Sequence, residues 1–228
     1  MYIKGERCKT TFIKYLNGKK IADLLPTIKK FVEEVFPESS ADDLVECHYV
    51  NNGKVDIELI VNNQKKRIMI KAGDNSLIHC EEIDKLMAFL LSVNVPFWIV
   101  QMLEKYLSTD TENELYQNVD VNLINDYLKK DFVLLPLLDR ILTFDYYNKK
   151  IDYLYYGNVL NGRWITMEEL KKVLINNKNN HTYKTVRIAN LALYKIYSKN
   201  QSNSYERKCG FKVGNLYTFI NKKSKSNP

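Results

Sequence analysis

An aspartate and a lysine stand at the same end of a predicted β-hairpin that spans residues 54–71. Two alternating, β-branched runs flank a turn signal at Asn62-Asn63, which is typical of paired strands. Asp56 begins the first strand and Lys71 ends the second, so the pairing brings them side by side. A carboxylate there binds Mg²⁺, with water and phosphate oxygens completing the shell, and the metal lowers the pKa of a bound water. The lysine orients or deprotonates that water and stabilises developing charge, which is chemistry suited to phosphodiesters.

The same residues also have structural interpretations. An Asp–Lys pair on a hairpin is often a surface ion pair, and the segment 73–76 reads as a turn followed by a helix cap. His79 suits packing or capping as well as a contact to phosphate. The Tyr-rich stretch 153–156 favours core packing over base stacking.

The hairpin KVDIELIV…RIMIK and the following stretch IKAGDNSLIHCEEI resemble the PD-(D/E)xK nuclease superfamily. The later pattern DYLYYGN…GRWITMEEL is similar to the same group, which includes uncharacterised bacterial and phage proteins. The resemblance is specific over 54–83 and loose over 30–228. It implies an α/β fold with a mixed-sheet, restriction-endonuclease-like core and Mg²⁺-dependent cleavage of double-stranded DNA, most often as a type II restriction endonuclease. Asp56 is then the first acid and Lys71 the lysine.

One position departs from that family pattern. The second acid is expected two residues before the lysine, where this chain has Met69, which cannot bind Mg²⁺. The resemblance allows the acid to move to a following helix, and Glu81 is our first choice there, one helical step after His79. The other candidates are Glu82 and Glu58, and more weakly Glu33 and Glu34 of an earlier helix. If none reaches the site, the chain is a catalytically inactive nucleic-acid-binding protein on the same fold.

Charge is distributed unevenly along the chain. Residues 1–150 carry 20 Lys and Arg against 23 Asp and Glu, whereas residues 151–228 carry 14 against 4. A basic region of this size indicates a polyanion partner, although an AT-rich coding sequence also enriches lysine. We expect double-stranded DNA as the partner and a homodimer that mirrors a palindromic site. A protein-interaction role is the third hypothesis. The candidate nucleic-acid-binding residues are Arg163, Arg187, Lys195, Arg207, Lys208 and Lys212.

Several other elements follow from periodicity and turn signals. Helices are predicted over 20–36, from Leu77 to Leu91, and over 121–145 with an interruption at Pro136, while 96–107 is a helix or a buried strand. Strands are predicted over 151–160, 163–166, 185–197 and 210–220, and Thr166 with Glu169 forms a capping box. Residues 108–120 read as an exposed loop, and 221–228 as a disordered tail.

Composition excludes several classes of protein. Hydrophobic residues make up 45 % and charged residues 27 %, as in ordinary globular chains. The four cysteines and three histidines have no zinc-site spacing, and free thiols favour a reducing compartment. We see no signal peptide, and the apolar run Leu86–Val100 is too short to span a bilayer, so a cytoplasmic protein is expected. The expected regions are a nuclease-like core (1–107), a helical segment (108–150) and a basic α+β region (151–228).

Overall fold

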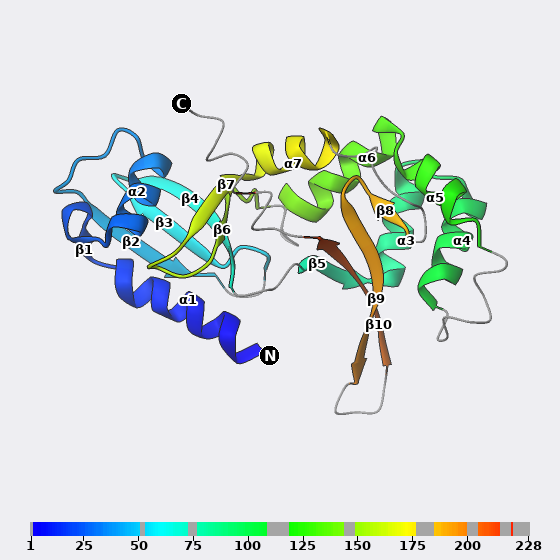
Figure 1. Cartoon of the computed structure of the whole chain (residues 1–228), viewed down its shortest axis with the longest axis horizontal. Coiled ribbons are helices and arrows are strands. Elements are labelled where there is room, and N and C mark those ends of the chain that lie inside the picture. The colour runs from blue at the N-terminus through cyan, green and yellow to red at the C-terminus, as the bar shows by residue number, and fades with distance from the viewer. Residues whose placement is uncertain are drawn as a thin grey trace. The chain divides into compact units, whose positions relative to one another are not determined.

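The computed structural model describes residues 2–50, 53–72, 77–108, 119–143, 149–176, 185–199, 205–214 and 220 (Figure 1). The chain divides into two compact units, each assembled from separate segments. Unit 1 comprises Met1–Asn75, Thr143–Leu170 and Leu216–Pro228, and unit 2 comprises Ser76–Leu142 and Lys171–Asn215. The three regions predicted from the sequence, 1–107, 108–150 and 151–228, are continuous in the chain, unlike these units. The functions assigned to the three regions stay predictions.

Unit 1 contains a six-stranded mixed sheet, as the predicted fold class requires. Its order is β1-β2-β3-β4-β6-β7, and every neighbouring pair is antiparallel except β4–β6, which is parallel. The strands are β1 (Lys19–Lys20), β2 (Leu44–Tyr49), β3 (Ile57–Val61), β4 (Gln64–Lys71), β6 (Tyr153–Tyr156) and β7 (Arg163–Thr166). A parallel pair needs a long crossover, and the whole of Ser76–Leu142 is inserted between β4 and β6.

The predicted β3–β4 hairpin is confirmed. Its two-residue loop is Asn62-Asn63, and both residues have positive φ, 49° and 63°. Asparagine tolerates this left-handed conformation better than most residues, and it matches the twist of the flanking strands. The register therefore pairs Ile57 with Ile68 and fixes which residues share each face of the sheet.

Two helices cover one face of this sheet. They are α1 (Tyr2–Leu16) and α2 (Pro26–Val35), and the core between them and the strands includes Phe12, Phe31 and Ile68. The helix predicted over 20–36 starts later than expected, because Pro26 occupies its first position and the preceding residues form β1 and the short 3₁₀ helix η1 (Ile21–Asp23). Proline suits a first helical position, since it has no N–H to leave unpaired.

Tyr155 is the central aromatic residue of that core, as its packing interpretation predicted. Its ring centroid lies 4.8 Å from that of Phe12 and 4.9 Å from that of Phe31, and its hydroxyl donates to the carbonyl of Asn158. A Cβ added at Gly162 would lie 1.6 Å from the Tyr155 hydroxyl oxygen. Glycine is required at this turn because the buried ring fills the space beside it.

Replacing Gly162 by alanine is expected to lower the free energy of unfolding by about 2 kcal/mol, because a buried ring must shift to make room. Denaturant unfolding measures the change. Gly214→Ala is the matched control, since nothing lies within 4 Å of a Cβ there. Equal stability of the two variants would contradict the packing described here.

Unit 2 combines an antiparallel sheet with helices. The sheet order is β5-β10-β9-β8. Its strands are β5 (Leu77–Glu82), β8 (Arg187–Ile188), β9 (Leu191–Lys199) and β10 (Tyr205–Val213). The helices are α3 (Ile83–Ser92), α4 (Phe97–Ser108), α5 (Val121–Leu128), α6 (Asp131–Leu138) and the π-helix η3 (Asp139–Thr143), whose last residue belongs to unit 1. Helix α7 (Met167–Asn176) has residues in both units.

The helix predicted from Leu77 to Leu91 is partly wrong. Residues 77–82 form strand β5, which pairs with β10, and the helix α3 begins only at Ile83. The apolar run has no clear period at its start, so pairing with a strand about 130 residues later decides the local structure.

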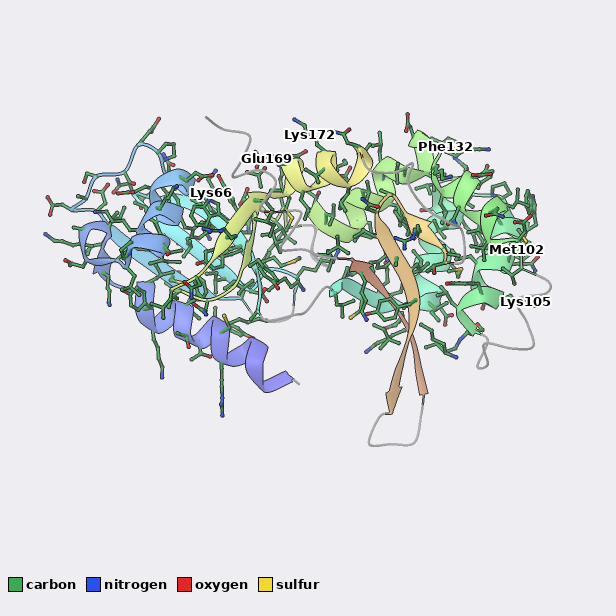
Figure 2. The ribbon with its side chains drawn as sticks, viewed as in Figure 1. Lys66, Met102, Lys105, Phe132, Glu169 and Lys172 are labelled. Carbon is green, nitrogen blue, oxygen red and sulfur yellow. The ribbon has the colours of Figure 1, made fainter. Side chains whose placement is uncertain are left out.

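The other predicted elements are mostly present. Residues 97–108 are helical. The predicted helical stretch 121–145 contains the helices α5 and α6 and the π-helix η3, with Pro136 inside α6. The predicted strand over 185–197 is split by a turn at Ala189, whose φ is 52°, and the last strand is 205–213 instead of 210–220. The capping box is confirmed, since the backbone N–H of Glu169 donates to Thr166 Oγ1 and the Glu169 carboxylate accepts from the Thr166 N–H. Glu169 is labelled in Figure 2.

Some predictions fall outside the described residues. These are the segment 73–76, most of the loop over 108–120, and the tail over 221–228. Among the described helices, none has the length and apolar character needed to cross a membrane.

Candidate active site

Asp56 and Lys71 both stand at the end of the β3–β4 hairpin that is opposite its turn. Asp56 directly precedes β3, and its backbone N–H donates to the carbonyl of Ile68. Its side-chain Oδ2 accepts the backbone N–H of Ile70 at 2.5 Å, so the carboxylate is anchored beside the residue that precedes Lys71. Lys71 is the last residue of β4 and lies opposite Tyr156 of β6. The backbone alone therefore positions an acid and a lysine at the same edge of the mixed sheet.

Lys9 of α1 also lies at this end of the hairpin, and it was not predicted from the sequence. The group of Asp56, Lys71 and Lys9 is called the Asp56 corner below. Its Nζ lies 2.5 Å from Oδ1 of Asp56, and only 9 % of the Asp56 side chain is exposed. Lys9 stands three residues before the fully buried Phe12, so helical periodicity turns both toward the sheet. The position of Lys9 at the buried edge of an amphipathic helix could have indicated that it pairs with an acid. The sequence does not show which acid, because Asp56 lies 47 residues away.

Cys8 lies in the same neighbourhood. Its thiol donates to the carbonyl of Gly157 at 3.4 Å. Burial raises the pKa of the Cys8 thiol, and the nearby charge of Asp56 raises it further. The thiol is thus held in its neutral form and acts as a small packing group rather than as a nucleophile.

Met69 is a buried apolar residue at the second-acid position. It is 1 % exposed, and because strand side chains alternate it lies on the same face of β4 as Lys71. Within the described ranges, no group of three or more His, Cys, Asp or Glu side chains is arranged to hold a metal ion. Mg²⁺ is nevertheless bound in many proteins by one or two carboxylates together with substrate phosphates. The Asp56 carboxylate fits that kind of site, which a substrate completes, but not an all-protein cage.

Glu81 occupies a different environment from the one expected. It lies in unit 2, on strand β5 rather than on a helix, so the helical reason for choosing it was wrong. Arg140 donates to its Oε2 from Nη2 at 2.5 Å and from Nε at 3.0 Å, and His79 Nε2 lies 3.3 Å from its Oε1. Burial alone would raise the pKa of Glu81, but the hydrogen bonds and charges of His79 and Arg140 outweigh it and lower the pKa. Both of its oxygens are engaged within unit 2.

His79 is mainly a packing residue of the same cluster. Its ring stacks on Phe211, with centroids 5.6 Å apart, and Arg140 lies over the ring of Phe89. This agrees with the packing interpretation of His79 and explains how a carboxylate with 1 % of its side chain exposed is tolerated. Arg140 itself was missed, because it is 59 residues away and no local pattern marks it.

The other candidate acids are held by ion pairs or lie at the surface. Glu58 receives Lys65 and Arg67 at 3.0 Å each, and although its burial acts to raise its pKa, these two partners lower it. Glu82 is exposed at the start of α3 and pairs with Lys85. The two weaker candidates, Glu33 and Glu34, lie on the exposed side of α2.

The basic candidates fall into two groups in unit 2, with Arg163 in unit 1. Lys195 and Arg207 lie on the face of the β9–β10 ribbon that also carries buried Cys209. Lys195 donates to the carbonyl of Ser108, and Arg207 reaches Glu104 and Ser108, so both fasten the ribbon to the end of α4. Arg187 lies on β8, where its Nε is buried without a hydrogen-bond partner in the structure.

Lys208 and Lys212 lie on the opposite face of the ribbon. Lys212 is exposed, and its Nζ lies 4.4 Å from the ring centroid of Tyr194. A Cβ at Gly210 would lie 2.8 Å from the Tyr194 ring, so the absent side chain lets the ring lie across β10. Burial raises the pKa of the Tyr194 hydroxyl. This face, defined by Tyr194, Lys208 and Lys212, is called the outer ribbon face below.

Comparisons with known proteins give a likeness of fold. The structure is similar to the crystal structure of the restriction endonuclease MspI in complex with its cognate DNA, with a TM-score of 0.58 and 14 % sequence identity. The match covers 92 % of this chain and 90 % of that one, so it includes both units. No family model matches the sequence, and no curated protein matches it. The mixed-sheet, restriction-endonuclease-like fold predicted from the hairpin is confirmed.

Proposed function

We propose that this chain is an endonuclease that binds and cleaves double-stranded DNA with Mg²⁺, in the manner of a type II restriction endonuclease. The observation that carries the proposal is that Asp56, anchored on the Ile70 N–H, and Lys71 stand at the same end of the β3–β4 hairpin, within a fold similar to that of a restriction endonuclease. Asp56 is buried and anchored, which keeps a charged oxygen in a fixed place at the end of the sheet.

Each residue of the corner has a defined role in this proposal. Asp56 holds the cation together with phosphate oxygens of the substrate, and a bound Mg²⁺ supplies polarisation of the phosphate and a lower pKa of its water. Lys71 orients the attacking water and stabilises the charge that develops on the phosphate. The backbone N–H of Ile70 keeps the Asp56 carboxylate in one orientation. Glu81 has no part in this mechanism.

DNA contact is assigned to the outer ribbon face. Lys208 and Lys212 lie on a face away from the ion pairs that engage Arg207, and lysines suit phosphate oxygens. We further propose a homodimer, because a two-fold protein matches a palindromic site, and light scattering in solution tests it.

A second candidate function follows from Met69. With an apolar residue at that position, the chain binds DNA on the same fold and does not cleave it. Both functions predict binding that weakens steeply with salt, since phosphate contacts release counterions, and they differ only in cleavage.

Incubation of the purified chain with mixed-sequence duplex DNA separates the two functions. We expect discrete fragments with Mg²⁺ and none with EDTA, and in EDTA an affinity for the duplex that falls at least tenfold between about 50 and 200 mM salt. Salt-sensitive binding without fragments would select the non-catalytic function. Absence of salt-sensitive binding would contradict both and favour a protein-interaction role.

A further inference from the structure

A lysine ammonium group contacts one oxygen of Asp56, the carboxylate that is proposed to hold the cation. Lys9 Nζ contacts Oδ1 at 2.5 Å, and the Ile70 N–H contacts Oδ2 at 2.5 Å. The pair is largely buried, with exposed side-chain fractions of 25 % for Lys9 and 9 % for Asp56. Attraction between them is therefore screened less than it would be at a surface. The negative charge of Asp56 is therefore already balanced by the positive charge of Lys9.

A divalent cation and the Lys9 ammonium group oppose each other at this carboxylate. A cation on Asp56 would lie at about 2.1 Å from an oxygen. The ammonium group would then lie only a few ångströms from that cation, and like charges so close repel strongly. Among the described residues, no group of three or more His, Cys, Asp or Glu side chains is arranged to hold a metal ion and so offset this repulsion. The free protein should bind divalent cations weakly for this reason.

We propose that Lys9 makes cation binding at Asp56 depend on bound DNA. In the free protein Lys9 holds Asp56, and when a DNA phosphate enters the corner Lys9 transfers its contact to that phosphate. Asp56 is then available to a cation that the same phosphate also binds. This inference rests on the proposed function, and it assigns Lys9 as a positioning residue that couples nucleic acid to metal.

The first test is calorimetric titration of Mn²⁺ into the DNA-free protein. Lys9→Met is expected to bind Mn²⁺ at least tenfold more tightly than the wild type, and Asp56→Asn in addition is expected to remove that binding. Lys14→Met is the matched control, because Lys14 lies on the exposed side of the same helix. Lys9→Gln serves as a second variant, and thermal melting followed by circular dichroism confirms that each variant is folded. Unchanged Mn²⁺ affinity in both Lys9 variants would overturn the inference.

The second test measures duplex affinity in EDTA, where no cleavage occurs. In the wild type, Lys9→Met should change the affinity less than twofold, because the contact that Lys9 gains with the phosphate replaces the contact that it loses with Asp56. In the Asp56→Asn background Lys9 gives up no ion pair with Asp56 when it contacts the phosphate, so the same change should weaken binding at least threefold and reduce the salt slope by about one phosphate contact. An equal effect in both backgrounds would overturn the inference while leaving the proposed function standing. No duplex binding by any variant would overturn both, and the Mn²⁺ titration would still report whether Lys9 and the cation compete.

Discussion

Replacing Lys71 by methionine is expected to slow DNA cleavage about a thousandfold. Methionine has a similar length and keeps the strand, but it neither orients a water nor stabilises a developing negative charge, and losses of this kind are typical for such groups. Affinity for the duplex in EDTA should fall less than threefold, because one charge among many phosphate contacts is removed. Single-turnover cleavage of a labelled duplex with Mg²⁺ measures the chemical step separately from binding.

Lys66→Met is the matched control for this variant. Lys66 lies on the same strand, β4, and is labelled in Figure 2, but it pairs with Leu59 at a distance from the Asp56 corner. The Lys66→Met variant loses the same charge and gains the same apolar side chain as the Lys71→Met variant. A comparable loss of cleavage in Lys66→Met would show that general charge on this strand matters, and it would contradict a specific role for Lys71.

Local sequence patterns were sufficient to predict the hairpin that carries Asp56 and Lys71. Asn62-Asn63 adopts two positive φ values, and alternation over β3 and β4 sets the faces, so the placement of Asp56 and Lys71 at the same end of the hairpin follows from local sequence. Here local preference and the final structure agree, as is usual where the contacts are local. The fold class, in contrast, was predicted from the resemblance of this stretch and its continuation to a nuclease superfamily.

Residues that meet across long stretches of chain could not be predicted in the same way. Lys9 contacts Asp56 from helix α1, and Arg140 contacts Glu81 from the π-helix η3. In neither case does spacing along the sequence reveal the partner. Glu81 itself was misplaced because 77–82 has no decisive period, and pairing with β10 makes it a strand. The choice of Glu81 as a metal ligand depended on a helix that the chain does not form.

Replacing Glu81 by alanine is expected to lower the free energy of unfolding of unit 2 by about 3 kcal/mol or more. Removal of one partner from a buried ion pair leaves the other charge without compensation, and here Arg140 loses its hydrogen bonds to Glu81 and His79 loses its contact. Denaturant unfolding followed by fluorescence and circular dichroism measures the change. Glu82→Ala, at the next residue, is the matched control, since Glu82 is exposed and pairs only at the surface with Lys85, where an ion pair contributes little.

The pH dependence of the same variants separates an ion-pair role from a metal-ligand role. The pKa of Glu81 is lowered in the folded chain, so its contribution is fully present above the ordinary carboxyl range and is lost as pH falls through the folded-state pKa. Wild type and Glu81→Gln should therefore differ in stability at pH 7 and converge under acidic conditions. A metal ligand would behave differently: its removal would relieve an uncompensated charge, leave stability unchanged or higher without metal, and weaken Mn²⁺ binding. Because Arg140 and His79 already engage the two oxygens of Glu81, we expect Mn²⁺ affinity in folded Glu81→Gln to equal that of the wild type, since this carboxylate stabilises unit 2 and does not bind the cation.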